Sequence, residues 1–308
     1  MPSYPSKDDV EEEVKRYEET VRFFAVFERV LNEGGLHPQI EPTCHKPDGS
    51  ICTPDFVVEE DDLKTVIDHK ASLSKNENNT MDELDDVYNK YIPLVPAGHG
   101  QIAALFPKSE ESAVQLTIHL LTNPLVLSSF LMMHDSKTLE LHTLKGIYLS
   151  PNLARIMSDR FRYEFLEFAK YKLIRMKPPV PLAADIIWSY VLLPLYGASD
   201  QFDDGATIDY QDILTETSTQ MRGYGTDSEE SLRGVVNDAL RFLDKIGWVE
   251  FRKQDEPVKV YARKGKGKGQ VRTQFCEKWF ELKANVSVTT RTEQKDNTRQ
   301  TSLEQDNG

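Results

Sequence analysis

The sequence lacks several features that define whole classes of protein. No apolar run approaches the length needed to cross a bilayer, and residues 1–10 are polar and acidic-leaning, without the basic segment and apolar stretch typical of a secretion signal. The three cysteines, Cys44, Cys52 and Cys276, are too few and too scattered for a disulfide framework. We therefore expect a protein of the reducing cytoplasm, either free there or associated with the nucleoid. We expect no membrane partner.

Positive charge is also scarce. The net charge of −13 at pH 7 argues against a nucleic-acid binder, because phosphate contacts are made by Lys and Arg. The charge is unevenly distributed, however: residues 252–272 hold eight Lys or Arg against two acids, whereas the first 20 residues hold seven acids. An acidic chain with one basic stretch can still bind DNA through its local potential.

What is present is enough chain for two modest domains, since 308 residues can bury two separate cores. The proline-rich stretch from Lys177 to Pro181 indicates a boundary between them. We predict a first domain over residues 1–150 and a linking helix with a Pro-rich linker over residues 151–180. A second domain with a basic tail is expected over residues 181–284, and a disordered polar tail over residues 285–308.

The first domain has the pattern of an α/β fold. Phe23, Phe24 and Phe27 recur at helical spacing and predict a helix over residues 8–33, which Gly34-Gly35 ends. Ser150-Pro151 is typical of a helix start, and that helix is expected to run to about Met176. Strands are expected at 39–41, 53–59, 64–73, 101–106, 113–121 and in parts of 127–149, with a helix at 81–91. The order helix, three strands, helix, strand predicts a mixed sheet between helices.

One short pattern carries chemistry. Pro54-Asp55 precedes an apolar strand, and twelve residues separate Asp55 from Asp68-His69-Lys70. Alternation along the second strand places Asp68 and Lys70 on one face, and a hairpin can bring Asp55 beside Asp68. Two adjacent carboxylates repel each other unless a divalent cation lies between them, and oxygen donors suit Mg²⁺ or Mn²⁺. A lysine at this place can hold or deprotonate an attacking water, or neutralise a phosphate.

This pattern resembles the PD-(D/E)xK, or restriction-endonuclease-like, nuclease superfamily. The resemblance covers roughly residues 8–120, and it implies a Mg²⁺-dependent DNA endonuclease. It further implies that Asp55 and Asp68 bind the metal, that His69 contributes its backbone carbonyl, and that Lys70 is the catalytic lysine. Many members add a glutamate from the preceding helix, for which we choose Glu19 over Glu13 and Glu28 as a further catalytic and metal-binding residue. Aspartate at the second acidic position is the less common choice in that family.

Two weaker interpretations concern the same region. Asp-x-Lys occurs by chance in charged proteins, and two exposed hairpin acids are usually only solvated. His37, Cys44, His45 and Cys52 lie within sixteen residues and have ligand types suited to zinc, but their spacing fits no CxxC knuckle. The combination of Pro-Asp, strand, spacing and flanking helices favours the nuclease interpretation over both.

The second domain reads as a winged helix: helices at 182–196, near 210–217 and at 228–246, followed by a hairpin of 248–252 and 258–263, with a last helix at 271–284. The third helix occupies the recognition position, although four acids, Glu229, Glu230, Asp238 and Asp244, dilute its surface. Winged helices also serve as protein-binding modules, so a protein partner is the alternative to DNA. The DNA-binding candidates are Arg233, Asn237, Arg241, Arg252, Lys253, Lys259, Arg263, Lys264, Lys266 and Lys268.

The sequence thus predicts a metal-dependent endodeoxyribonuclease with a winged-helix module. A nuclease followed by a winged helix is also the order in the endonuclease subunit of some cut-and-paste transposases, a likeness of architecture alone. One rival is a non-catalytic DNA-binding or adaptor protein with an inactive nuclease fold, and a second is a transcription factor with an unrelated α/β sensor domain. The expected partners are DNA and, through the winged helix, a protein, while a homodimer stays open.

Overall fold

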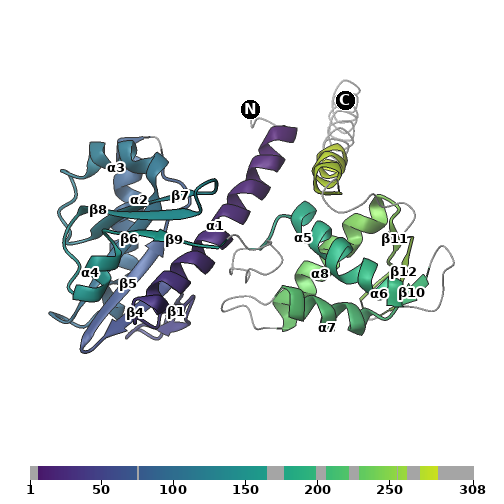
Figure 1. The fold of residues 1–308 in the computed structure, drawn as a ribbon, viewed down its shortest axis with the longest axis horizontal. Helices are drawn as coiled ribbons and strands as arrows, with labels where there is room; N and C mark the ends of the chain where they lie inside the picture. Colours follow the sequence, from purple (N-terminus) through teal and green to yellow (C-terminus); the bar gives the residue numbers. More distant parts are fainter. Residues whose placement is uncertain are drawn as a thin grey trace, which may run out of the picture. The chain divides into compact units, whose positions relative to one another are not determined.

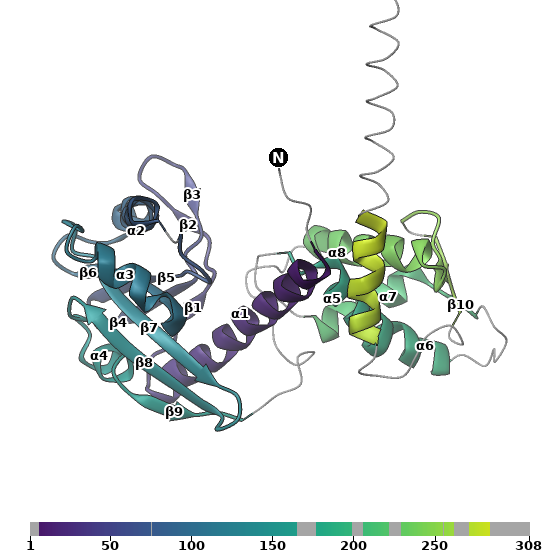
Figure 2. The ribbon, with the colours of Figure 1, turned by 90° about the horizontal axis from the view of Figure 1, so that it is seen from above.

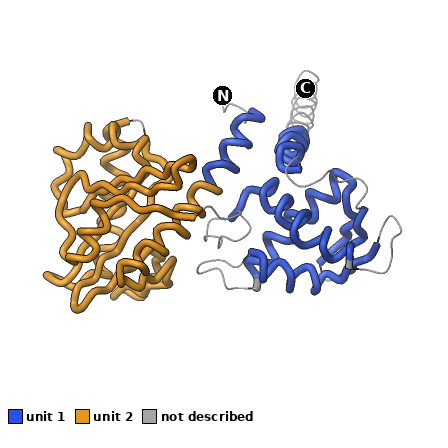
Figure 3. The backbone as a smooth tube through the Cα atoms, in the orientation of Figure 1, with its two compact units in different colours: residues 1–17, 177–221, 228–308 blue, residues 18–176, 222–227 orange. Residues whose placement is uncertain are grey.

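A computed structural model describes residues 6–74, 76–164, 177–198, 206–221, 229–254, 256–261 and 271–283. The chain divides into two compact units (Figure 3). Glu18–Met176 and Arg222–Asp227 form the unit that we call the sheet unit. Met1–Tyr17, Lys177–Met221 and Ser228–Gly308 form the unit that we call the C-terminal unit. The first helix, α1 (Lys7–Glu33), contributes residues to both.

The sheet unit is built on a seven-stranded mixed sheet in the order β1-β4-β5-β6-β7-β8-β9 (Figure 1). Only β5, β6 and β7 are parallel neighbours, because helices α2 (Glu77–Tyr91) and α3 (Glu111–Thr117) supply the long connections that parallel strands need. A separate hairpin pairs β2 (Cys44–His45) with β3 (Ile51–Cys52). The sheet strands are β1 (Gln39–Ile40), β4 (Phe56–Glu60), β5 (Leu63–His69), β6 (Gly100–Pro107), β7 (Val126–Met133), β8 (Thr138–Lys145) and β9 (Arg160–Arg162). The predicted α/β class with a mixed sheet is confirmed.

Helices cover both faces of this sheet (Figures 1 and 2). On one face, Leu84 and Val87 of α2 share an apolar core with Val66 of β5 and Ala104 of β6. On the other face, Phe23 of α1 contacts the opposite side of the strands, as its ring stacks on that of Phe130 with centroids 3.9 Å apart. The helix α4 (Pro151–Ile156) lies on this second side, since Ile156 packs closely on Gly34 at the end of α1. The two faces therefore have separate apolar cores.

Most of the predicted elements of this unit are present, with two corrections. The strand predicted at 113–121 is wrong, because that segment begins with α3, which buries Val114 and Thr117 on a single helical face. The long helix predicted from residue 151 to about 176 is wrong over residues 157–164. Ser150 does cap α4, its hydroxyl accepting from the Leu153 amide, but the helix ends at Ile156 and the chain adds β9 to the sheet. Residues 165–176 lie outside the described part of the chain.

The C-terminal unit combines helices with a small antiparallel sheet. The chain forms α5 (Val180–Ile186), the π-helical turn η4 (Ile187–Leu192) and α6 (Leu193–Ala198), then β10 (Ala206–Ile208), α7 (Tyr210–Gln220), α8 (Glu229–Lys245), β11 (Val249–Glu250) and β12 (Val258–Val260). The three strands pair in the order β10-β12-β11, and residues 271–283 form a last helix. Aromatic rings fill the core, where Trp248 lies 4.7 Å, between ring centroids, from both Trp188 and Phe275. The disordered tail predicted over 285–308 lies outside the described residues.

One sequence-based expectation on membranes needs correction. The segment Val180–Gly197 is long and apolar enough, by length and composition alone, to cross a membrane. More than half of it is buried inside the structure, and Trp188, Val191 and Leu192 are among the fully buried side chains. Burial of this kind is also what the central helix of a folded domain shows.

Candidate functional site

The hairpin of β4 and β5 brings the two predicted aspartates together. Its two-residue turn places Asp61 at a φ of 52°, a left-handed conformation that aspartate tolerates better than most residues. This turn sets the register in which Phe56 pairs with Ile67. The next pair outward along the same register is Asp55 and Asp68, on the face that α2 covers. A slip of one residue would place these carboxylates on opposite faces of the sheet.

Asp68 is the most constrained residue of the site. It is 5% exposed, and its Oδ2 atom lies 3.0 Å from the Lys70 ammonium, whose side chain remains 30% exposed. Its Oδ1 atom lies 2.7 Å from the Tyr91 hydroxyl, at the end of α2. The same hydroxyl is 3.1 Å from the Thr53 carbonyl oxygen, so its single proton has the shorter contact with the carboxylate. Asp68 is thus held from both sides by donors.

Asp55 is partly buried at the start of β4 and has a strongly shifted pKa. Burial, together with the neighbouring charge of Asp68, raises the pKa of Asp55 to about 8. The amide of His69 donates to Asp55 Oδ2 at 2.5 Å and opposes this rise. The charge of Glu41 adds to it, and the Glu41 amide donates to the Asp55 carbonyl oxygen at 2.8 Å. A shift of this size is typical of groups that bind cations or move protons.

The ring of His69 packs under α1, while its main chain contacts Asp55. Its ring packs 5.0 Å, between centroids, from Phe23 of α1, and burial lowers its pKa to about 4, so the imidazole is neutral at ordinary pH. The His69 amide donates to Asp55, and in an extended strand the amide and the carbonyl of one residue project from the same edge. The His69 carbonyl therefore also faces Asp55. The aromatic packing therefore fixes a backbone carbonyl on the Asp55 side of β5.

The predicted helix glutamate, Glu19, belongs to a helix that covers the other face of the sheet from Asp68 and Lys70. Glu19 is exposed on α1, whereas its neighbour Glu18 is buried. Helix α1 packs on the face of β5 from which His69 projects, and Asp68 and Lys70 project from the opposite face. The additional carboxylate whose charge acts on Asp55 is instead Glu41, which is 5% exposed and follows β1. The choice of Glu19 stays a prediction, with Glu41 as its structural competitor.

The donor set fits a divalent cation with few protein ligands. Asp55 and Asp68 could supply carboxylate oxygens to such a cation, and the His69 carbonyl could supply a third oxygen. Mg²⁺ accepts such a set because it keeps several of its waters. Within the described ranges, no group of three or more His, Cys, Asp or Glu side chains is arranged to hold a metal ion. For zinc, Cys44 and Cys52 lie opposite each other across the hairpin, but within the described ranges no third His, Cys, Asp or Glu joins them, and His37 lies 3.3 Å from Asn32 Oδ1.

The raised pKa of Asp55 predicts how metal-free protein responds to pH. Between the ordinary pKa of 3.8 and the folded value of about 8, the folded state holds a proton that the unfolded state has released. The free energy of unfolding should therefore fall as the pH rises through this window. We expect Asp55→Asn to gain stability relative to wild type between about pH 5 and pH 8 in thermal unfolding with EDTA. Asp62→Asn, in the exposed turn of the same hairpin, is the control, and an identical pH dependence for wild type and Asp55→Asn would contradict the assignment.

The DNA-binding candidates of the C-terminal unit fall into three groups. Arg241 is exposed on α8, but Asn237 accepts from the Tyr210 hydroxyl at 2.9 Å and Arg233 lies over the Tyr210 ring at 6.0 Å. Arg252 pairs with Glu250 at 2.9 Å and Lys253 with Glu256 at 3.0 Å, while Lys259 lies 5.4 Å over the Tyr261 ring. Arg263, Lys264, Lys266 and Lys268 lie outside the described residues. The bond from Tyr210 therefore occupies the amide oxygen of Asn237 and does not involve its Nδ2 donor.

Sequence reasoning missed three residues that the structure adds. Tyr91 looked like part of the apolar face of its helix, four residues after Val87, and nothing in that spacing shows that its hydroxyl meets Asp68. Glu41 lies in the turn after β1 with a φ of 46°, and no pattern indicated its burial. Lys245 is exposed four residues after Arg241, so helical spacing alone could have found it.

No family model matches the chain, and no curated protein sequence matches it significantly.

Proposed function

We propose that this chain is a Mg²⁺-dependent DNA endonuclease that hydrolyses phosphodiesters at the Asp55–Asp68–Lys70 cluster. The observation that carries the proposal is the contact of 3.0 Å between Lys70 Nζ and Asp68 Oδ2, beside an Asp55 carboxyl whose pKa is raised to about 8. A lysine, two acids and a backbone carbonyl at the adjoining ends of two paired strands make a combination suited to phosphoryl chemistry. If the two acids were merely solvated at the surface, without a function, the burial of Asp68 would have no explanation.

The fold supports the resemblance to the PD-(D/E)xK superfamily. The order α1, then β1, β4 and β5 as antiparallel neighbours, then α2, then β6 parallel to β5, is the helix, three strands, helix, strand pattern expected of a restriction-endonuclease-like domain. The acids lie where β4 begins and β5 ends, so the site lies at one end of these two paired strands. This position of the acids is a likeness to the superfamily in fold only, because topology alone does not establish activity.

The residues of the site have separable roles in this proposal. Asp55, Asp68 and the His69 carbonyl would hold Mg²⁺, which when bound polarises a phosphate oxygen and lowers the pKa of a coordinated water. The Lys70 ammonium, still partly exposed beside Asp68, orients the attacking water or neutralises charge on the phosphate as the ester bond breaks. Tyr91 fixes the orientation of the Asp68 carboxylate, and Phe23 holds the His69 ring so that its main chain faces Asp55.

The C-terminal unit supports a winged-helix module. Its order is helix, β10, α7, α8, β11 and β12, with β12 between the other two strands, so that α8 takes the recognition position and the β11–β12 connection the wing. Two acids that seemed to dilute α8 are engaged elsewhere: Asp238 pairs with Lys177, and Asp244 accepts from the Phe251 amide at 3.1 Å. We infer that Arg241 and Lys245 present positive charge to a DNA backbone.

A non-catalytic DNA-binding or adaptor protein is the competing function. The observation that favours it is the lack of a three-carboxylate group in the described part of the chain. Incubation of purified full-length protein with duplex and supercoiled DNA separates the two proposals. A nuclease should cut with Mg²⁺ or Mn²⁺, stop cutting in EDTA and recover when Mg²⁺ is restored. DNA binding without cleavage under all of these conditions would establish the adaptor.

A further inference from the structure

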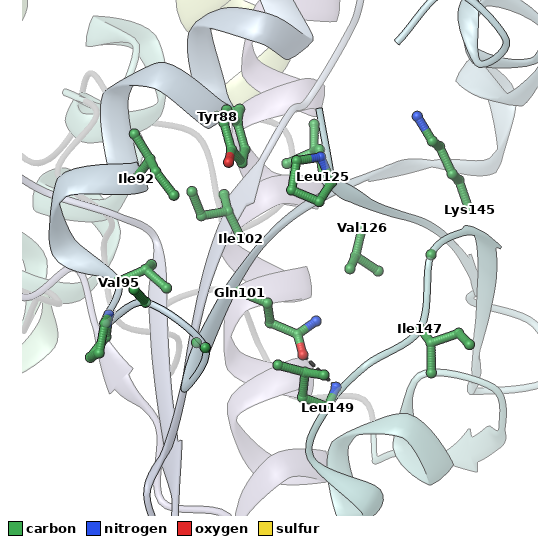
Figure 4. A pocket seen from close by; sticks show the side chains of 16 residues that line it. Tyr88, Ile92, Val95, Gln101, Ile102, Leu125, Val126, Lys145, Ile147 and Leu149 are labelled. Carbon is green, nitrogen blue, oxygen red and sulfur yellow. Dashed lines mark hydrogen bonds between the residues drawn. The ribbon is translucent and has the colours of Figure 1, made fainter. Parts of the chain in front are cut away.

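The sheet unit has a pocket at the end of the sheet far from the aspartates. Its volume is about 560 Å³, within the range of small-molecule sites. It opens where β6 and β7 begin and β8 ends, whereas Asp68 and Lys70 lie at the end of β5. Tyr88 of α2 and Ile92, the residue after that helix, line one wall, and Lys145, Ile147 and Leu149 line another (Figure 4). The pocket is therefore distinct from the nuclease site.

The lining is apolar apart from three polar side chains, those of Tyr88, Gln101 and Lys145. All three can donate a hydrogen bond, and no aspartate or glutamate is among the 16 residues of the lining. Lys145 remains a donor with its other protons after its Nζ atom bonds the Leu121 carbonyl at 2.8 Å. The pocket thus offers donors and a positive charge to an occupant, which has to supply the acceptor.

Gln101 is the residue that indicates a ligand. It is 9% exposed, and its Oε1 atom accepts from the Leu149 amide, a bond drawn in Figure 4. Because only the oxygen can accept, this bond fixes the Nε2 atom on the other side of the amide group. That Nε2 atom is buried and has no hydrogen-bond partner in the structure. A buried donor without an acceptor costs free energy, which an acceptor on a bound molecule would recover.

The rim of the pocket is apolar and exposed. Among the described residues, six large hydrophobic side chains are exposed, and Ile92, Ile147 and Leu149 of the rim make up half of them. Ile147 is the most exposed of the six, at 82%. It follows Gly146, whose φ of 83° favours glycine and turns the chain out of β8 at the mouth of the pocket. Exposed apolar side chains gathered at a concave site mark a place of binding.

We propose that this pocket binds a small amphipathic carboxylate, with its apolar chain against the apolar lining and its carboxylate at one of the two donors, Lys145 or Gln101, which face different parts of the cavity (Figure 4). The chemical class is that of a medium-chain fatty acid. The apolar lining accommodates the chain, the exposed rim covers its outer end, and the lack of acidic side chains in the lining excludes a cationic head group. This inference does not depend on the proposed nuclease activity.

The test is titration of the full-length protein with decanoate and with 1-decanol, which has the same chain and a neutral head, followed by calorimetry. We expect one saturable site for decanoate, about tenfold tighter than for 1-decanol, because one charge-assisted hydrogen bond has about that effect. The variant of the donor that the carboxylate contacts, Lys145→Met or Gln101→Leu, should reduce this preference, and Ile147→Ser should weaken both ligands. Leu116→Ser changes an equally apolar exposed residue away from the pocket and should alter neither.

The outcomes divide cleanly. Saturable binding that Ile147→Ser and at least one of the Lys145 and Gln101 variants weaken supports the proposal. If Gln101→Leu fails to fold, because the Leu149 amide loses its acceptor, Lys145→Met and Ile147→Ser still decide. Absence of saturable binding below the micellar range of decanoate overturns the proposal, as does binding that Leu116→Ser weakens as much as Ile147→Ser.

Discussion

Lys70→Ala should reduce the rate of Mg²⁺-dependent DNA cleavage by about a hundredfold to a thousandfold, which is the usual effect of losing a donor to the transition state. The variant should stay folded. Among the described residues, Lys70 is the one positive charge paired with Asp68, at 3.0 Å, and its partial exposure leaves it able to reach a substrate. Removing it leaves the two acids without this neighbouring cation. The measurement is the rate of duplex cleavage at saturating Mg²⁺, together with thermal unfolding of the same preparation.

The control is Lys64→Ala, which removes another lysine of β5 that also has an ion pair, with Glu59 at 3.7 Å. Lys64 lies at the far end of the strand, so its loss should leave the rate within about twofold, as for surface ion pairs. Equal cleavage by Lys70→Ala and Lys64→Ala would refute the assignment of Lys70.

Asp55→Asn should lower cleavage to background without loss of stability near pH 8, because the buried carboxyl there is costly to ionise. Tyr91→Phe should lower the cleavage rate only about tenfold, since it removes a hydrogen bond to a proposed metal ligand and leaves that ligand in place.

The β4–β5 part of the site could be predicted because its geometry is local. Strand alternation alone places Asp68 and Lys70 on one face and His69 on the other, and the observed contacts follow that rule. A hairpin turn of two residues then fixes which residue lies beside Asp68. These relations need only a period of two and a turn that accepts Asp61, both of which are visible in the sequence.

The parts that could not be predicted depend on tertiary contacts. Short apolar runs do not distinguish a strand from a helix, so the run 113–121 was assigned to the wrong element although Val114 and Thr117 fit one helical face. The end of α4 at Ile156 was missed because strand pairing of β9 with β8, a contact across the sheet, takes the following residues. In the same way, the bond of Tyr91 to Asp68 joins residues 23 positions apart on different elements.

The other large effect concerns DNA binding by the C-terminal unit. Reversal of Lys264, Lys266 and Lys268 to glutamate should weaken binding to all sequences alike and flatten the slope of log K against log salt by about three units, roughly one for each phosphate contact. Reversal of Arg241 and Lys245, exposed four residues apart on α8, should flatten it by about two. Fluorescence anisotropy with a labelled duplex at several salt concentrations gives both slopes.

The full chain is the right material for this measurement, because the C-terminal unit includes the start of α1 and Lys7 pairs with Glu277 at 2.7 Å. Lys278→Glu is the control for the single reversal Arg241→Glu: Lys278 already pairs with Glu281 in the last helix, so its reversal makes the same change in net charge at a place where we expect no DNA. If Lys278→Glu flattens the slope as much as Arg241→Glu, the effect is one of overall charge and α8 has no special role. If neither α8 nor the lysine-rich segment alters the slope, these residues contact no phosphates, because counterion release is unavoidable when phosphates are contacted, and a protein partner becomes the better interpretation of the unit.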